Sequence, residues 1–155
     1  MNSTLDTLTI ATAGHVDHGK STLVKLITGT DTDTLAEEKS RGLSINLGFA
    51  YLPFVDSTNS DTRHKSIAFV DVPGHVDFTA NMLAGVGMVE TCMLVIAADD
   101  GIMPQTREHL AILDLLGVNQ GCVVISKIDR VDTARRDQVK QDVANLLADT
   151  SLRML

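Results

Sequence analysis

The feature that most constrains the fold is a glycine-containing stretch, GHVDHGKS at residues 14–21, which matches the phosphate-binding pattern G-x-x-x-x-G-K-[ST]. Thr7 to Ala13 before it predicts a short strand, and Leu23, Leu26 and Ile27 after it fall at helical spacing. Between a strand and a helix, glycines let backbone N–H groups close on phosphate oxygens, while the helix directs its positive end towards them. The sequence therefore predicts a strand, a phosphate-binding loop and a helix in succession.

Individual residues of this loop have distinct expected roles. Lys20 would neutralise charge on the β- and γ-phosphates of a nucleotide, and the Ser21 hydroxyl would bind Mg²⁺. The predicted nucleotide-binding stretch comprises Gly14, His15, Val16, Asp17, His18, Gly19, Lys20, Ser21 and Thr22. One alternative is a glycine-rich turn before a surface helix. A second is a metal site on His15, Asp17 and His18, which lacks further ligands.

A second motif, DVPGH at residues 71–75, follows the apolar run Ile67 to Val70. Asp71 is expected to hold Mg²⁺, usually through a water molecule. Gly74 would let a backbone N–H approach the γ-phosphate, which makes this loop a sensor of that phosphate. The alternative is a Pro-Gly turn in which Asp71 caps a helix.

A third motif, SKID at residues 126–129, follows another apolar run. The Asp129 carboxylate can accept hydrogen bonds from N1–H and the 2-amino group of guanine, a donor pair that adenine does not present. The Lys127 stem can lie over the purine, and Ser126 lies at the start of the motif. The alternative is a solvated strand end. All three motifs follow predicted strands, which is where open α/β sheets bind ligands.

Strand-like and helix-like segments alternate along the chain. The predicted strands are Thr7–Ala13, Leu47–Pro53, Ser66–Val72, Cys92–Ala98 and Cys122–Ser126. Four helices are predicted. The first follows the phosphate-binding loop, the second lies near 76–86, and the third begins at Pro104 and ends at Gly117. The fourth spans Thr133 to about Asp149 and is capped by Asp132 or Thr133. Thr28 to Asn46 is expected to be a mobile loop. This order predicts an α/β fold of the P-loop NTPase class: a mostly parallel sheet, one antiparallel edge strand from a hairpin, and helices on both faces.

Composition limits the possible partners and location. With 155 residues and a formal net charge of −7, the chain is the size of one domain, and the acidic balance argues against binding RNA or DNA by itself. No apolar run long enough for a membrane span and no signal peptide is visible, so we expect a cytosolic protein. Cys92 and Cys122 each adjoin an apolar run and are expected to be reduced core thiols.

Taken together, the motifs resemble those of translational GTPases, and in particular the selenocysteine-specific elongation factors, with elongation factor Tu as the nearer alternative. The stretches that carry the resemblance are IATAGHVDHGK at 10–20, EEKSRGLSI at 37–45, LGFA at 47–50, NMLAGVG at 81–87 and QTREHL at 105–110. The resemblance is dense from about Thr9 to Val131.

The resemblance implies further roles for individual residues. Ser44 stands where the family has a threonine that ligates Mg²⁺ and senses the γ-phosphate. His75 matches the histidine that positions the attacking water, with Val16 and Leu43 at the family's flanking apolar gate. Ser126 replaces the usual asparagine, so an amide contact to the base and to the phosphate-binding loop is expected to be missing. That loss predicts nucleotide binding weaker by about 1–2 kcal/mol.

The resemblance also implies cofactors and partners: GTP or GDP with Mg²⁺, ribosome-stimulated GTP hydrolysis, and selenocysteinyl-tRNA held through domains outside this chain. We expect a monomer in the cytoplasm, with no DNA and no membrane partner. Residues 1–155 would form a single GTP-binding domain without its last strand and final guanine-binding loop. An elongation factor Tu-like GTPase and a nucleotide-binding fragment without useful turnover are the alternatives.

Overall fold

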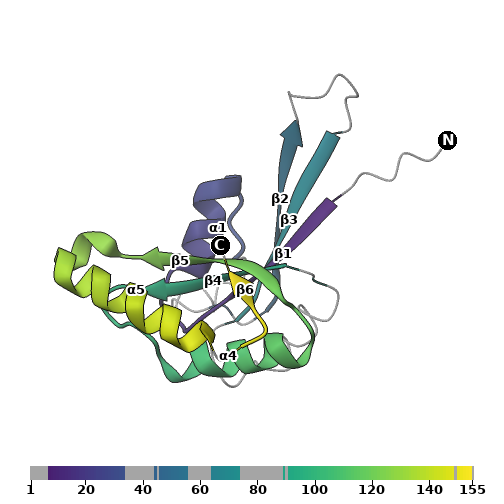
Figure 1. Ribbon diagram of the computed structural model, residues 1–155. Coiled ribbons are helices and arrows are strands. Elements are labelled where there is room, and N and C mark those ends of the chain that lie inside the picture. The colour runs from purple at the N-terminus through teal and green to yellow at the C-terminus, as the bar shows by residue number, and fades with distance from the viewer. Residues whose placement is uncertain are drawn as a thin grey trace.

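A six-stranded sheet forms the centre of the computed structural model, in the order β2-β3-β1-β4-β5-β6 (Figure 1). The model describes residues 7–33, 44, 46–55, 64–73, 89, 91–148 and 150–154. The strands are β1 (Thr7–Ala13), β2 (Gly48–Val55), β3 (His64–Asp71), β4 (Thr91–Ala97), β5 (Gln120–Ser126) and β6 (Arg153–Met154). The pairs of β1 with β3 and β4, of β4 with β5 and of β5 with β6 are parallel. The predicted mostly parallel sheet is therefore confirmed.

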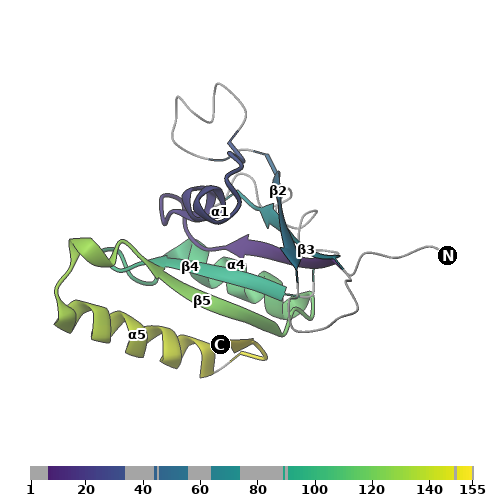
Figure 2. The ribbon, with the colours of Figure 1, turned by 90° about the horizontal axis from the view of Figure 1, so that it is seen from above.

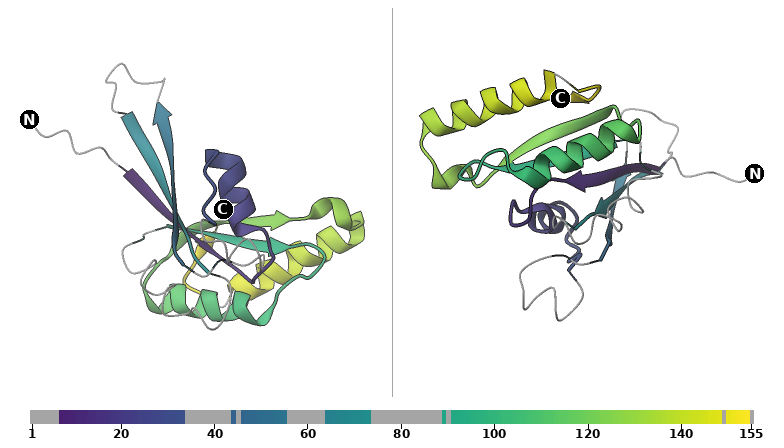
Figure 3. Two further views of the ribbon diagram at one scale, coloured as in Figure 1. Left: turned by 180° about the vertical axis from the view of Figure 1, so that it is seen from behind. Right: turned by 90° about the horizontal axis from the view of Figure 1, so that it is seen from below.

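The predicted hairpin supplies the antiparallel edge strand. β2 pairs with β3 from Gly48 opposite Asp71 to Val55 opposite His64. Pro53 is tolerated in β2 because an edge strand leaves one side of its backbone unpaired. β2 and β3 rise away from helices α4 (Pro104–Leu115) and α5 (Thr133–Ala148) (Figure 3). The prediction missed the first residues of β3 and β5, because His64, Lys65 and Gln120 are polar and carry no apolar signal.

Helices cover both faces of the sheet, as predicted. Helix α1 (Lys20–Thr28) lies on one face, and α4 and α5 lie on the other (Figure 2). Alternate residues of β4 point to the two faces, which follows from the period of a strand. Met93 and Val95 pack in the core under α1, whereas Cys92, Leu94 and Ile96 pack in the core under α4 and α5.

The helix ends follow the sequence signals closely. Helix α1 ends at Thr28, one residue later than predicted, and Gly29 follows it with a left-handed φ of 75° and an N–H that bonds to Lys25 O. Pro104 begins α4, and Gly117, also with a φ of 75°, follows its end. Asp132 Oδ1 accepts the Arg135 N–H at 2.8 Å, so Asp132 is the residue that caps α5.

The last strand and the cysteines add two findings. β6 is a two-residue strand that pairs with Gln120 and Gly121. The expectation that the domain lacks its last strand and its final guanine-binding loop stays a prediction. Cys92 and Cys122 are free thiols, as predicted, and burial raises the pKa of Cys92 to about 12.

Among the described residues, no helix is long and apolar enough to cross a membrane. The predicted helix near 76–86 lies outside the described residues.

Candidate nucleotide-binding site

The phosphate loop, residues 14–21, connects the end of β1 to α1. Gly14 has a φ of 127°, and a Cβ atom there would lie 2.2 Å from the Val95 carbonyl oxygen, so glycine is required. Asp17 has a left-handed φ of 62°, which is costly for a non-glycine residue and typical of functional loops. Gly19 precedes α1, and no side chain among the described residues caps this end of the helix. The first N–H groups of α1 are therefore available to an anion.

Lys20 is buried at the concave side of this loop. Its side chain is 6% exposed, and Nζ donates a hydrogen bond to the His15 carbonyl oxygen at 2.9 Å. Burial lowers the pKa of Lys20 to about 8, although the carboxylates of Asp71, Asp17 and Asp33 oppose this shift. A lysine held in this way is poised to exchange a backbone contact for phosphate oxygens.

A cavity of about 160 Å³ lies in front of Lys20. It is lined by Val16, Asp17, Gly19, Lys20, Ser21, Thr22, Asp33 and Ser44. Ser44 Oγ donates to Asp33 Oδ1 at 2.6 Å, so Ser21 Oγ must be the donor in its 2.9 Å contact with Ser44 Oγ. Hydroxyl and carboxylate oxygens are the ligands that Mg²⁺ prefers. Ser21 and Ser44, predicted as metal ligands, thus meet at one cavity together with Asp33, which the sequence analysis missed.

Asp71, the other predicted metal residue, is 1% exposed at the end of β3. Its Oδ1 accepts a hydrogen bond from Thr12 Oγ1 at 2.8 Å, and its Oδ2 accepts one from Thr32 Oγ1 at 2.6 Å. Gly48 lies opposite Asp71, and a Cβ atom at Gly48 would lie 2.5 Å from Thr32 Cβ. The glycine therefore leaves room for Thr32 to reach Asp71. Each carboxylate oxygen retains a lone pair, so binding of Mg²⁺ through water stays a prediction.

The predicted base-reading residues follow β5. Lys127 has a left-handed φ of 52° and leads into a 3-10 turn over Ile128–Arg130, where Asp129 is exposed. Ser126 Oγ donates to the His18 carbonyl oxygen at 2.6 Å. A hydroxyl of β5 therefore contacts the backbone of the phosphate loop at this position. The expectation that an amide contact to the base is missing, with weaker nucleotide binding, stays a prediction.

The comparisons with known proteins agree with this geometry. The family model described as the elongation factor Tu GTP binding domain matches residues 5–153. The chain belongs to this family.

Relatives of this GTP-binding domain include the selenocysteine-specific elongation factor of Escherichia coli (strain K12), 54% identical over 138 residues, or 89% of this chain and 21% of the relative. The crystal structure of a bacterial selenocysteine-specific elongation factor has a TM-score of 0.85 at 40% identity and covers 97% of this chain and 25% of that chain. Elongation factor SelB from Methanococcus maripaludis, in complex with the GTP analogue GppNHp, has a TM-score of 0.77 at 24% identity, over 99% of this chain and 30% of that chain, and shares the fold. The chain spans about a fifth of the length of the curated relatives it matches.

Not every predicted residue of this GTP-binding domain faces the cavity. The described residues that were predicted for the site but do not line it are Gly14, His15, His18, Asp71, Ser126, Lys127 and Asp129. The His18 ring is fully buried, with Nδ1 3.3 Å from the Val95 carbonyl oxygen. The alternative of a metal site on His15, Asp17 and His18 gains no support, because no cluster of three acidic, histidine or cysteine ligands occurs within the described part of the chain. Gly74, His75 and Leu43 lie outside the described residues.

The two buried histidines of this domain, His18 and His109, predict acid sensitivity. Burial lowers the pKa of each to about 4 from 6.5. Between these values the unfolded chain binds more protons than the folded one, so the unfolding free energy should fall as pH falls, by about 1.4 kcal/mol per pH unit for each histidine. Urea denaturation from pH 6.5 to 4.5 measures the slope. His109→Gln should reduce it, and a midpoint that does not change with pH would contradict the assignment.

Proposed function

We propose that this domain binds GTP and GDP with Mg²⁺, hydrolyses GTP, and serves as the nucleotide switch of a factor that delivers selenocysteinyl-tRNA to the ribosome. The observation that carries the proposal is the convergence of Lys20, Ser21, Ser44 and Asp33 on one cavity beside the open end of α1. The selenocysteine-specific elongation factors among its relatives support the choice of tRNA.

The proposed reaction is in-line attack of water on the γ-phosphate of GTP. Lys20, once its amine has exchanged the His15 carbonyl oxygen for phosphate oxygens, and the N–H groups at the start of α1 stabilise the negative charge on the phosphates. Ser21, Ser44 and Asp33 at the cavity, together with Asp71 at the end of β3, would hold Mg²⁺. The ion would supply positive charge that offsets the charge of the phosphates. His75 orients the attacking water, as the family resemblance implies.

The net charge of the chain and the identity of its relatives both bear on the proposed partners. A net charge of −7 disfavours contact of this domain alone with RNA, because phosphate binding requires clustered lysine and arginine. We therefore assign tRNA binding to other parts of a longer protein and expect the factor to act in the cytoplasm as a monomer. GTP hydrolysis is expected to depend on the ribosome.

A single-turnover phosphate-release assay tests the proposed activity. The protein is loaded with GTP and Mg²⁺, and phosphate is measured with and without ribosomes. Release that ribosomes accelerate supports the proposal. GTP binding without release under either condition indicates a nucleotide-binding module without turnover, and absence of GTP binding contradicts the proposed function altogether.

Base choice is tested by Asp129→Asn. An ionised Asp129 accepts from two purine donors, whereas asparagine presents one donor, which suits the carbonyl that xanthine carries in place of the 2-amino group of guanine. We expect GDP affinity to fall tenfold or more, from about 1.5–3 kcal/mol for a charged hydrogen bond, and affinity for xanthosine diphosphate to rise.

Competition among GDP, ADP and xanthosine diphosphate measures this ranking. The matched control is Asp137→Asn, which removes an exposed carboxylate of α5 that lies near Lys140. The control should rank the nucleotides as the wild type does. An unchanged ranking in Asp129→Asn would mean that Asp129 does not read the base.

A further inference from the structure

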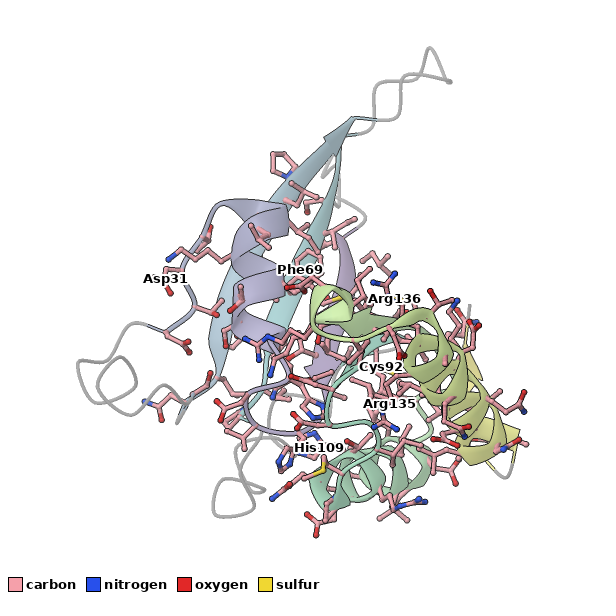
Figure 4. All side chains as sticks on the ribbon, turned by 90° about the vertical axis from the view of Figure 1, so that its left-hand side faces the viewer. Asp31, Phe69, Cys92, His109, Arg135 and Arg136 are labelled. Carbon is pink, nitrogen blue, oxygen red and sulfur yellow. The ribbon has the colours of Figure 1, made fainter. Side chains whose placement is uncertain are left out.

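A buried histidine outside the three sequence motifs contacts the start of the phosphate loop. The Gly14 N–H donates a hydrogen bond of 3.0 Å to Nδ1 of His109, 95 residues further along the chain. His109 belongs to α4 and is 4% exposed. Figure 4 shows His109 on α4, beside the chain that leaves β1.

This hydrogen bond fixes a part of the loop that has little freedom on its other side. A Cβ atom at Gly14 would collide with the Val95 carbonyl oxygen of β4, so the backbone of Gly14 is packed directly against that strand. His109 then holds the N–H of the same residue from α4. Gly14 is therefore clamped between a strand and a helix.

The far part of the loop has separate anchors. The ring of His18 contacts the Val95 carbonyl oxygen, and the His18 carbonyl oxygen accepts the hydroxyl of Ser126. Between the two anchored residues run Val16 and Asp17, which line the cavity. The position of this segment thus depends on both ends, and His109 is the side chain that holds the first.

The chemistry of the contact requires a neutral imidazole. Nδ1 accepts a hydrogen bond from Gly14, so a ring proton must reside on Nε2. Burial keeps the pKa of His109 near 4, and the nearby charges of Lys20 and His15 act in the same direction. At neutral pH the acceptor is therefore always present.

We propose that His109 is a positioning residue of the nucleotide site: by accepting the Gly14 N–H it holds the start of the phosphate loop and so lengthens the residence time of a bound nucleotide. The inference rests on the proposed function, since it requires a nucleotide at this loop. His109 acts through Gly14 and does not line the cavity.

The test compares His109→Leu, His109→Asn and His109→Gln. Leucine removes the acceptor at similar volume, asparagine restores an acceptor near the Nδ1 position, and glutamine places its amide near Nε2, away from Gly14. Dissociation of a fluorescent GDP analogue is followed after mixing with excess GDP. A buried N–H without an acceptor is costly, so His109→Leu should release the nucleotide about tenfold faster. His109→Gln should behave similarly, and His109→Asn should stay within about threefold of the wild type.

Leu113→Ala is the matched control for a purely structural effect. Leu113 lies on the same helix and is fully buried in the core under α4 and α5. This variant should lower the urea midpoint strongly while leaving the dissociation rate within twofold of wild type.

The possible outcomes separate the inference from the proposed function. The inference would be overturned if both His109→Leu and His109→Gln release the GDP analogue at the wild-type rate. It would also be overturned if His109→Asn releases the analogue as fast as His109→Leu does. If His109→Leu does not fold, the ratio of His109→Gln to His109→Asn decides. A wild-type protein that fails to bind the analogue would instead contradict the proposed function.

Discussion

Replacing Lys20 with alanine should abolish detectable binding of GTP and GDP. The buried ammonium group lies at the cavity in front of the open end of α1, and its bonds to two phosphate groups would each contribute about 1.5–3 kcal/mol. The loss should therefore exceed about 100-fold in affinity for either nucleotide. Calorimetric titration with GDP and GTP in the presence of Mg²⁺ measures it.

The same substitution should leave the fold intact. Burial lowers the pKa of Lys20 to about 8 from 10.5, so the charged amine destabilises the nucleotide-free protein near pH 7. This destabilisation is absent from the variant. The melting temperature without nucleotide should be at least that of wild type, and added GDP should no longer raise it. Lys25→Ala, on the exposed side of α1 where Lys25 pairs with Asp31, should bind GDP normally. Unchanged GDP affinity in Lys20→Ala would contradict the phosphate-binding assignment.

Replacing His75 with alanine should remove most of the ribosome-stimulated hydrolysis while keeping GTP affinity within a few-fold. A residue that positions water acts on the transition state, so its loss lowers the rate and leaves ground-state binding almost unchanged. Stimulation reaches about 10⁵-fold in other GTPases, which sets the scale of the possible loss.

Quench-flow measurement of phosphate release with saturating ribosomes measures the rate of His75→Ala. The control is His64→Ala, at the opposite end of β3 from Asp71. The control should hydrolyse GTP at the wild-type rate. Equal stimulated rates in His75→Ala and wild type would exclude the water-positioning role.

Most of the fold could be predicted because its signals are local. The strands β2 to β5 each contain an apolar run, and β1 alternates apolar residues with threonine. Gly29, Pro104, Gly117 and Asp132 mark helix ends through their own backbone preferences or side-chain bonds. β6 could not be predicted, since two residues show no periodicity. Its pairing with β5 depends on tertiary position.

The site residues also fall into those that a local motif predicts and those that only the fold brings together. The phosphate loop is contiguous, so its residues could be named from one motif. The hydroxyl partners of Asp71 could not, because Thr12 and Thr32 lie 59 and 39 residues away and nothing local connects them. Asp33 lies in a polar segment that resembles any exposed loop, and the contact of Ser126 with His18 spans 108 residues. Side chains that support a motif from elsewhere in the chain appear only once the fold brings them together.

The side chains of β4 pack alternately into two cores, and this separation determines how substitutions in the two cores combine. Among the described residues, the core under α1 and the core under α4 and α5 contain different side chains. Substitutions such as Val24→Ala and Leu113→Ala should therefore have additive effects on stability, as expected for sites without shared contacts. A change in packing under α1 should therefore leave the packing under α4 and α5 unchanged. The start of the phosphate loop, which His109 of α4 contacts at Gly14, should then keep its support when the core under α1 is altered.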